Sequence, residues 1–482
     1  MNRGKKFHFT PTNINMKRFN LIVATDIQGG IGLDNQLPWH FSSDSRFFLS
    51  ATSQNIVPNT SNVLIMGRKT WESLGRKNLP GRIFFVLSSR HQEFSALYGT
   101  SSTRFYPDLQ NAYVSANLLF PLANLWVIGG VSVYQAALGH WACGDIFWTK
   151  IHGLFPSEVS LDWDPHRIEW TPLFETLERN RVDEQTYLLS FFRGKRSPNA
   201  ETQYLEALFD VCREGEERQT RNAKTWSLFN RQWSWDLEDG FPLLTTKKMF
   251  WKGIVEELLF FIRGDTDSSK LSEKGIRIWE GNTRREFLDN RGFTDYPEGE
   301  MGPMYGYQWR FYGRPWGDGD GGIDQLQNLV EEIKKDPHSR RLLMTNFNPQ
   351  QVDQGVLYPC HSIITQFYVR EGCLDCSMYQ RSGDLFLGVP FNIASLSLLV
   401  HIVARLTGLR PGKVILTLGD CHIYEQHLDA VSLQLTRIPQ ARLPTLQIKA
   451  FETLPEVETM TWEDFTLKGY EPLGTISAPM IA

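Results

Sequence analysis

The sequence is poor in cysteine, nearly balanced in charge and without a long unbroken apolar run. Six cysteines in 482 residues are too few for a disulfide scaffold, and they predict a reducing compartment. A net charge of −4 gives no indication of nucleic-acid or anionic-membrane binding. The longest apolar run, 391–409, is interrupted by Asn392, His401 and Arg405, so it predicts a core helix and no membrane span.

The N-terminal segment, 1–18, has no acidic residue and no apolar core of a secretory signal. We interpret it as a flexible basic tail and expect a cytoplasmic protein, with a mitochondrial presequence as the alternative. The chain is 41% hydrophobic and 22% charged, which is typical of a soluble globular protein. Its length predicts more than one domain.

The first half alternates apolar, β-rich runs with helical patterns, which predicts an α/β sheet with parallel strand pairs. The predicted strands are 19–25, 62–67, 81–89, 124–130 and 144–151, and the predicted helices are 42–52, 68–74, 108–118 and 132–139. A late run, 185–194, is interpreted as a strand that closes an edge of the sheet. We expect one domain over 19–194, a polar linker over 195–202 and a second domain over 203–482, opening with a helix at 203–215.

Three strand-to-helix junctions of the first half carry residues suited to phosphate. They read "VIGGVSVY" (127–134), "MGRKTWESLG" (66–75) and "LSSR" (87–90). Glycine lets backbone approach a ligand, helix N-termini favour phosphate, and the added cations suit the extra phosphate of NADP(H). None is the GxGxxG fingerprint, so a tight turn without a ligand is the alternative for the glycine pair.

Asp44 is the acid of the stretch "GLDNQLPWHFSSDSRFF" (32–48), with two serines before it and two phenylalanines after it. One interpretation is an ordinary helix-start carboxylate, which the helix dipole favours. The other is a lone acid in an apolar pocket that holds a cationic or amide-like heterocycle.

These motifs, with "LIVAT", "GIGLDNQLPW", "LPGR" and "FWTKI", occur in the order found in dihydrofolate reductases, which residues 19–193 resemble. The resemblance implies a twisted mixed sheet with flanking helices, and NADPH and dihydrofolate in facing clefts. Asp44 would hold the pterin and help deliver a proton, with Trp39 ordering a water and Thr149 supporting the acid. Phe48 and Arg82 would bind the rest of the folate. The implied NADPH-binding residues are Ala24, Ile31, Gly32, Arg68, Lys69, Thr70, Ser88, Ser89, Arg90, Gly129, Gly130, Val131, Ser132, Val133 and Tyr134.

Cys360 lies between Pro359 and His361 in "LYPCHSIITQ", at the start of an apolar strand-like run. It is either a small buried hydrophobe or a nucleophile. A nucleophilic thiol needs nearby cations, and Arg340, Arg341 and Arg381 are candidates. The residues alone leave a cysteine hydrolase fused to a dinucleotide enzyme as an alternative.

"EELLFFIRGDT" (256–266), 276–289, "GPMYGYQWR" (302–310), "LYPCHS" and "GDCHIY" (419–424) together resemble thymidylate synthase from about residue 201 onward, with an α+β fold. The two halves together resemble the bifunctional dihydrofolate reductase–thymidylate synthases of protists and plants. The resemblance implies that Cys360 adds to carbon 6 of dUMP, and that methylene-tetrahydrofolate donates the carbon and the reducing equivalents. The catalytic residues it implies are Cys360, Glu257, Arg381, Asn392 and Tyr305. Trp279 and Asp384 would bind folate.

The resemblance also implies a homodimer formed through the synthase domain, with Arg340 and Arg341 reaching the partner's site, and no metal. The implied dUMP-binding residues are Arg221, Arg340, Arg341, Cys360, His361, Gln380, Arg381, Ser382, Asp384, Asn392, His422 and Tyr424.

One segment departs from the synthase pattern. The family's glycine-containing phosphate loop is replaced by "RQTRNAKTWS" (218–227), in which Arg221 is the nearest counterpart. An active reductase with a degenerate, structural synthase half is therefore an alternative. Cys373 and Cys376 form a single CxxC without a second pair, so zinc is not expected.

Overall fold

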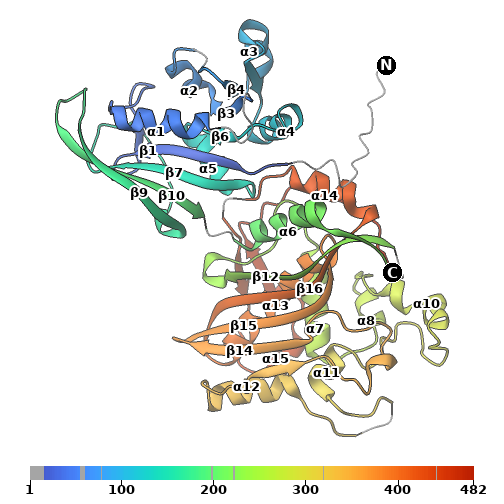
Figure 1. The fold of residues 1–482 in the computed structure, drawn as a ribbon. Helices are drawn as coiled ribbons and strands as arrows, with labels where there is room; N and C mark the ends of the chain where they lie inside the picture. The colour runs from blue at the N-terminus through green and yellow to red at the C-terminus, as the bar shows by residue number, and fades with distance from the viewer. Residues whose placement is uncertain are drawn as a thin grey trace, which may run out of the picture. The chain divides into compact units, whose positions relative to one another are not determined.

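The computed structural model describes residues 16–54, 60–76, 79–196, 199–220, 223–317, 320–440 and 442–481. The backbone divides into two compact units (Figure 1). We call residues 16–202 with 436–440 the N-terminal unit, and 203–435 with 442–481 the C-terminal unit.

The N-terminal unit is built on an eight-stranded sheet with the order β5-β4-β3-β6-β1-β7-β10-β9. Neighbouring strands from β5 to β7 are parallel, whereas β10 is antiparallel to both β7 and β9. Its elements are β1 (Phe19–Thr25), β2 (Gly30–Gly32), α1 (Ser42–Ser53), β3 (Asn62–Gly67), α2 (Arg68–Ser73), β4 (Arg82–Leu87), α3 (His91–Tyr98), β5 (Thr103–Tyr106), α4 (Leu109–Leu119), β6 (Leu125–Val127), α5 (Val131–Gly139), β7 (Cys143–Ile151), β8 (Val159–Ser160), η2 (Pro165–Arg167), β9 (Ile168–Arg179) and β10 (Thr186–Arg196).

The central strands of this sheet are apolar on both faces because helices cover both. β3 is buried along nearly its whole length, and β1 buries five of its seven residues. Such continuous apolar runs are typical of parallel strands. The predicted α/β sheet with parallel pairs is therefore confirmed.

One feature of the predicted sheet is wrong. The late run 185–194 forms β10, which is not an edge strand, because β9 pairs along its outer side from Thr186 to Arg196. The sequence of β9 has no continuous apolar run, and most of its side chains are exposed.

The expected tail and linker also differ from the structure at their borders. The backbone N–H of Lys17 donates to Asn117 Oδ1 at 2.6 Å, and Tyr113 Oη donates to the Lys17 carbonyl at 2.8 Å. Lys17 is thus held in place, while 1–15 lie outside the described residues. Residues 195–196 belong to β10 and 200–202 to α6 (Ala200–Glu214), which leaves only 197–199 between the two elements.

The C-terminal unit is built on a six-stranded sheet with the order β11-β12-β16-β15-β14-β13. Only β15 and β16 are parallel. Besides α6, its elements are β11 (Glu216–Gln219), β12 (Lys224–Asp236), η3 (Leu237–Asp239), α7 (Trp251–Ile262), α8 (Ser269–Ser272), α9 (Glu280–Thr283), α10 (Arg285–Asn290), α11 (Gly306–Phe311), α12 (Gln325–Lys335), β13 (Leu343–Thr345), η4 (Val352–Gln354), β14 (Ile364–Arg370), β15 (Cys373–Asp384), α13 (Gly388–Leu406), β16 (Arg410–Tyr424), η5 (Glu425–His427), α14 (Leu428–Leu435), β17 (Thr445–Ile448), α15 (Leu454–Thr459), η6 (Trp462–Asp464) and β18 (Phe465–Lys468).

Helix α13 is the core element of this unit. It is long and apolar enough to cross a membrane, but 78% of its apolar window is buried inside the protein. The helix packs against β15 and β16, and the hydroxyl of Ser397 on its buried face accepts a hydrogen bond from Trp235 of β12. The apolar run 391–409 is a core helix, as predicted.

Candidate active sites

Asp44 sits in the first turn of α1. The hydroxyl of Thr149, a buried residue of β7, hydrogen-bonds its carboxyl group. Burial raises the pKa of Asp44 to about 6, the Thr149 hydrogen bond acts in the opposite direction, and the negative charge of Glu178 raises it further. An ordinary helix-start carboxylate would have a lowered pKa, so this environment favours a proton-carrying acid.

The two aromatic residues expected to act with this acid, Trp39 and Phe48, lie in apolar clusters of the N-terminal unit. Trp39 is buried, and its ring lies 5.2 Å from that of Phe155. The Trp39 Nε1–H is buried without a hydrogen-bond partner among the described residues. A buried polar group is usually satisfied, so this N–H is a ready donor to the water that Trp39 was expected to order. Phe48 is half-buried against the core of the sheet.

Arg82, at the start of β4, is a buried cation. Its guanidinium donates to the carbonyls of Pro80 and Leu49 at 2.8 and 2.7 Å and to Thr52 Oγ1 at 3.3 Å. Burial lowers the pKa of Arg82. Its partners among the described residues are neutral, and its Nε–H has none. A charge held this way is suited to a carboxylate ligand such as the glutamate of folate.

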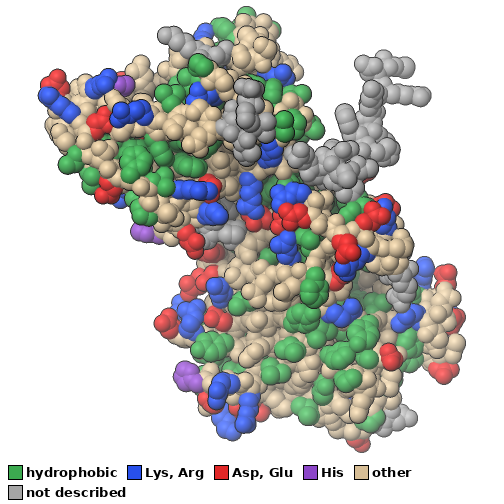
Figure 2. Space-filling view, in the orientation of Figure 1, with side chains coloured by type: hydrophobic (Ala, Val, Ile, Leu, Met, Phe, Trp, Pro, Cys, Tyr) green, Lys and Arg blue, Asp and Glu red, His purple; other side chains and the backbone are tan. Residues whose placement is uncertain are grey.

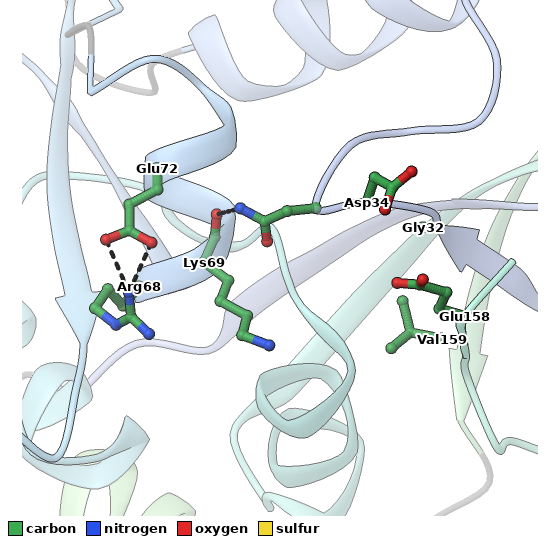
Figure 3. A pocket seen from close by; sticks show the side chains of 8 residues that line it. Gly32, Asp34, Arg68, Lys69, Glu72, Glu158 and Val159 are labelled. Carbon is green, nitrogen blue, oxygen red and sulfur yellow. Dashed lines mark hydrogen bonds and ion pairs between the residues drawn. The ribbon is translucent and has the colours of Figure 1, made fainter.

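A cavity of about 450 Å³ opens beside β2 and the start of α2. Figure 3 shows the side chains that line it, including Arg68 and Lys69 of α2 and Asp34 and Glu158 opposite them. The Arg68 guanidinium binds both oxygens of Glu72, at 2.8 and 2.7 Å. Both side chains of this ion pair are partly exposed, so a ligand phosphate could reach Arg68 and replace Glu72 as its partner.

The other residues expected to bind NADPH lie at the carboxyl ends of adjacent parallel strands. Ala24 is near the end of β1, Thr70 lies in α2 and Ser88–Arg90 follow β4. Gly129 and Gly130 lie between β6 and α5, and Val131–Tyr134 form the start of α5. Such ends share one edge of a sheet, where ligands bind in open α/β folds.

The glycine pair, Gly129 and Gly130, leaves room and backbone donors for a nucleotide. Gly130 begins α5 without a side-chain cap, which leaves backbone N–H groups for phosphate. Gly129 has φ of 120°, and a Cβ there would lie 3.1 Å from Tyr134 Oη. The Tyr134 hydroxyl is fixed because it donates a hydrogen bond to the Ile22 carbonyl. Only glycine allows this close approach. The residues present fit NADPH.

Cys360 lies in the segment between η4 and β14, next to Tyr305 and Arg381. Its Sγ is 3.4 Å from Tyr305 Oη, and its carbonyl accepts the backbone N–H of Arg381 at 2.8 Å. Burial raises the pKa of the thiol, while the Tyr305 hydrogen bond and the Arg381 charge lower it without offsetting burial. Arg381 acts in the expected direction, but within one chain the thiol stays neutral.

His361 packs on the same tyrosine. Its ring stacks on Tyr305 at 4.3 Å with 12° between the planes. Burial lowers the pKa of His361 to about 4, so the imidazole is neutral at physiological pH. It therefore offers hydrogen bonds rather than charge to a ligand.

Glu257 on α7 is the second acid with a perturbed pKa. Trp279 Nε1 donates to its carboxylate at 2.9 Å. Burial raises the pKa of Glu257 to about 7, and the Trp279 bond lowers it. The rings of Trp279 and Tyr305 lie 5.9 Å apart, so Glu257, Trp279, Tyr305 and Cys360 form one continuous cluster. A carboxyl titrating near 7 can both give and take protons.

A further group of expected residues lies at the end of β15 and the start of α13. Gln380 Nε2 donates to Asn392 Oδ1 and to the Ser382 carbonyl, both at 3.0 Å. The Gln380 Oε1 is buried without a partner among the described residues. The Asn392 amide thus has a fixed orientation, with its Nδ2 group directed away from Gln380 and available to a pyrimidine edge.

Asp384 contacts a residue that the sequence interpretation did not assign to the site. It accepts the Phe386 N–H at 2.9 Å and lies 3.4 Å from Nδ1 of the buried His427. His427 Nε2 in turn lies 2.8 Å from the Pro479 carbonyl. Nearby, His422 Nδ1 is 2.9 Å from Asp420 Oδ1 and its ring meets Tyr424 edge-on.

Two of the expected arginines are not brought to Cys360. Arg340 and Arg341 are exposed in the loop between α12 and β13, and no side-chain interaction is seen for them in the described parts of the chain. Arg221 lies outside the described residues. Within the described ranges, no three His, Cys, Asp or Glu side chains form a group that could hold a metal.

Two family models match the chain. Thymidylate synthase covers residues 202–482 and dihydrofolate reductase covers 18–194. The bifunctional dihydrofolate reductase-thymidylate synthase of Paramecium tetraurelia is 34% identical over 96% of this chain and 99% of that protein. The chain belongs to the bifunctional dihydrofolate reductase–thymidylate synthase family.

Other relatives agree with this membership. The enzyme of the same name from Leishmania major is 37% identical over 97% of this chain and 94% of its own length. A thymidylate synthase of Human herpesvirus 8 is 46% identical over 60% of this chain and 86% of its own length. The chain is therefore a bifunctional enzyme that reduces dihydrofolate and makes thymidylate, and the alternative of a cysteine hydrolase is wrong.

Proposed function

We propose that the two activities use separate sites, the reductase around Asp44 and the synthase around Cys360, in domains 19–194 and 203–482. The observation that carries this assignment is that each site joins a partly buried acid of raised pKa to described residues of its own unit. NADPH supplies the hydride for reduction. Methylene-tetrahydrofolate supplies carbon and reducing equivalents to dUMP.

In the reductase site, Asp44 keeps a proton close to neutral pH and passes it toward the pterin through the water ordered by Trp39. Arg82 binds the glutamate carboxylate, and Phe48 packs on the folate. Thr149 fixes the carboxyl group of Asp44. These roles place polar groups at the two ends of the ligand and apolar surface between them, as ligand pockets usually do.

In the synthase site, Cys360 is the nucleophile that adds to carbon 6 of dUMP. Arg381 supplies one cation, but burial keeps the pKa of the Cys360 thiol above its usual value. Activation therefore requires additional cations, and Arg340 and Arg341 of a partner subunit are suited to this role. Glu257 relays protons to the pyrimidine, and Asn392 recognises its edge.

The homodimer proposal has a second line of support in the outer face of the six-stranded sheet. Large apolar side chains are exposed there, among them Phe229 at 76% and Tyr368 at 63% of their full surface, with Ile364 and Tyr379. Figure 2 shows hydrophobic side chains gathered on the visible face of the C-terminal unit. Contiguous apolar surface of this kind marks an association site, and a second copy of the sheet is our proposed occupant.

Mixed dimers test the shared site. Cys360→Ser and a double variant with Arg340→Ala and Arg341→Ala are each expected to lack synthase activity. After random exchange about half the dimers are mixed, so roughly one-quarter of all sites should be intact. Recovery toward that fraction of wild-type activity, with unchanged dihydrofolate reduction, supports the proposal. A mixture that stays inactive although light scattering confirms exchanged dimers contradicts it.

The synthase activity is measured directly by a spectrophotometric assay with dUMP and methylene-tetrahydrofolate, because only a working synthase produces dihydrofolate. Absence of that product would favour the alternative of a structural synthase half, to which the altered segment 218–227 points. We propose a cytoplasmic location, in keeping with six cysteines that form no disulfide, and cell fractionation tests it.

A further inference from the structure

The N-terminus of α1, which carries Asp44, is capped by a side chain from a distant strand. Phe41 at the N-cap position offers no side-chain acceptor. Instead, Glu178 of β9 accepts the backbone N–H of Ser42 at 2.6 Å and that of Ser43 at 3.0 Å, and it also accepts the Ser43 hydroxyl. One carboxylate thus satisfies two of the N–H groups that a helix start leaves unpaired.

The neighbouring backbone strengthens this connection. The His40 N–H donates to Asn180 Oδ1 at 2.9 Å, and the Arg181 N–H donates to the His40 carbonyl at 3.2 Å. Arg181 also reaches the Ser42 hydroxyl at 2.8 Å. The segment before α1 is therefore fixed to the end of β9 at several points.

We propose that Glu178 is a positioning residue for the reductase: it fixes the first turn of α1 and places a permanent negative charge beside Asp44, which favours the protonated form of that acid. The inference rests on the proposed role of Asp44 as the proton donor. It assigns to β9 a function in the chemistry, although β9 contributes none of the expected ligand-binding residues.

Two electrostatic effects act in the same direction. A helix N-terminus ordinarily stabilises a carboxylate in its first turn. Here Glu178 binds the N–H groups at that terminus, so the helix stabilises the ionised form of Asp44 less. Although burial opposes ionisation of Glu178, the hydrogen bonds from Ser43 and Ser42 hold its pKa below the usual range, so it stays charged. A fixed anion near Asp44 then disfavours a second negative charge.

The other charged and titratable groups around the pair are few. Arg46 on α1 attracts Glu178, and Arg181 lies in the turn after β9. The charge of Asp44 acts on Tyr134 of α5. Burial and this charge both raise the pKa of Tyr134, so the tyrosine is neutral. Thr149 contributes a hydrogen bond and no charge.

The test is the pH profile of dihydrofolate reduction by the full chain, measured as kcat and KM. Reduction that needs protonated Asp44 declines as the pH rises through its pKa. Glu178→Gln removes the charge but keeps an amide oxygen as acceptor, so the declining limb should move down by about half a pH unit. That shift corresponds to a roughly threefold loss of kcat at pH 7.5, with the KM for NADPH within twofold of wild type.

Two variants separate charge from structure. Glu178→Asp keeps the charge, so its pH profile should remain at that of wild type even if thermal stability falls. Arg46→Gln is an exposed change that serves even if Glu178→Gln does not fold. It removes a cation that offsets the negative charge of Glu178, so that charge should act more strongly on Asp44 and move the limb toward higher pH. Glu169→Gln, on the exposed side of β9, is the control and should change nothing.

Each outcome has one meaning. If Glu178→Gln and Glu178→Asp lower stability but leave the limb in place, or if Arg46→Gln leaves it in place, Glu178 is only a helix cap and the inference is overturned. If Asp44→Asn leaves reduction and its pH profile unchanged, the proposed role of Asp44 fails instead.

Discussion

Replacing Asp44 by asparagine should stabilise the N-terminal unit at neutral pH while abolishing dihydrofolate reduction. The folded protein raises the pKa of this carboxyl from 3.8 to about 6. A difference of about two pKa units corresponds to ~3 kcal/mol. Because Asp44 is partly exposed, solvent reduces that cost, and we expect an effect of about 1–3 kcal/mol.

The sign follows from proton linkage. A group whose folded pKa lies above its unfolded pKa favours the folded state below the unfolded value and loses this contribution as the pH rises through the folded value. Wild-type stability therefore falls between about pH 4 and pH 7 by the amount that Asp44 contributes. The Asp44→Asn variant has no such transition, so its difference from wild type should be near zero at about pH 4 and largest at about pH 7.

Urea unfolding monitored by hydrogen exchange measures this effect in the full chain. Peptides from β1 and β7 report on the N-terminal unit separately from the C-terminal unit. In thermal unfolding the same effect amounts to roughly 2–4 °C per kcal/mol. Glu169→Gln, which removes an exposed carboxylate of β9, is the matched control and should show no pH-dependent difference. A stability gain of equal size at pH 4 and pH 7 would refute desolvation of Asp44 as its cause.

Three further outcomes are expected. Cys360→Ser should abolish thymidylate formation while dihydrofolate reduction stays within twofold of wild type; loss of both activities in a folded protein would contradict separate sites. Trp279→Phe removes the hydrogen bond that lowers the pKa of Glu257, which burial raises to about 7. The synthase pH profile should therefore move toward alkaline pH by about one unit. An unchanged profile would show that Trp279 does not control the pKa of Glu257. Arg221→Ala should raise the KM for dUMP more than it lowers kcat; unchanged dUMP saturation would place Arg221 outside the site.

Local pattern predicted the parts of the fold that are buried continuously. β1, β3 and α13 were recognisable because strands and helices inside a core are apolar along their length. β9 was not, because most of its side chains are exposed and its sequence, "IEWTPLFETLER", mixes polar and apolar residues around a proline. Its place in the sheet depends on pairing with β10, which no local pattern encodes.

The same limit applies within the sites. Glu256 and Glu257 are adjacent and identical in type, yet Lys274 Nζ and the Trp462 N–H hold Glu256 at 2.6 and 2.9 Å, while Glu257 faces Trp279. The two glutamates differ in the direction in which their side chains leave α7. This direction makes Glu256 a structural anion and Glu257 a titrating acid. Glu178 was missed for a related reason, since its partners lie more than a hundred positions away in the sequence.

The distribution of thiols offers a way to count working synthase sites. None of the six cysteines forms a disulfide, and only Cys143 and Cys360 are even partly accessible. Burial raises the pKa of Cys212, Cys376 and Cys421, which makes them slow toward alkylating reagents. An alkylating label should therefore enter at most two positions per folded chain, and dUMP should protect one of them. The protected fraction measured by mass spectrometry then gives the proportion of molecules in a preparation that can bind nucleotide, independently of any turnover assay.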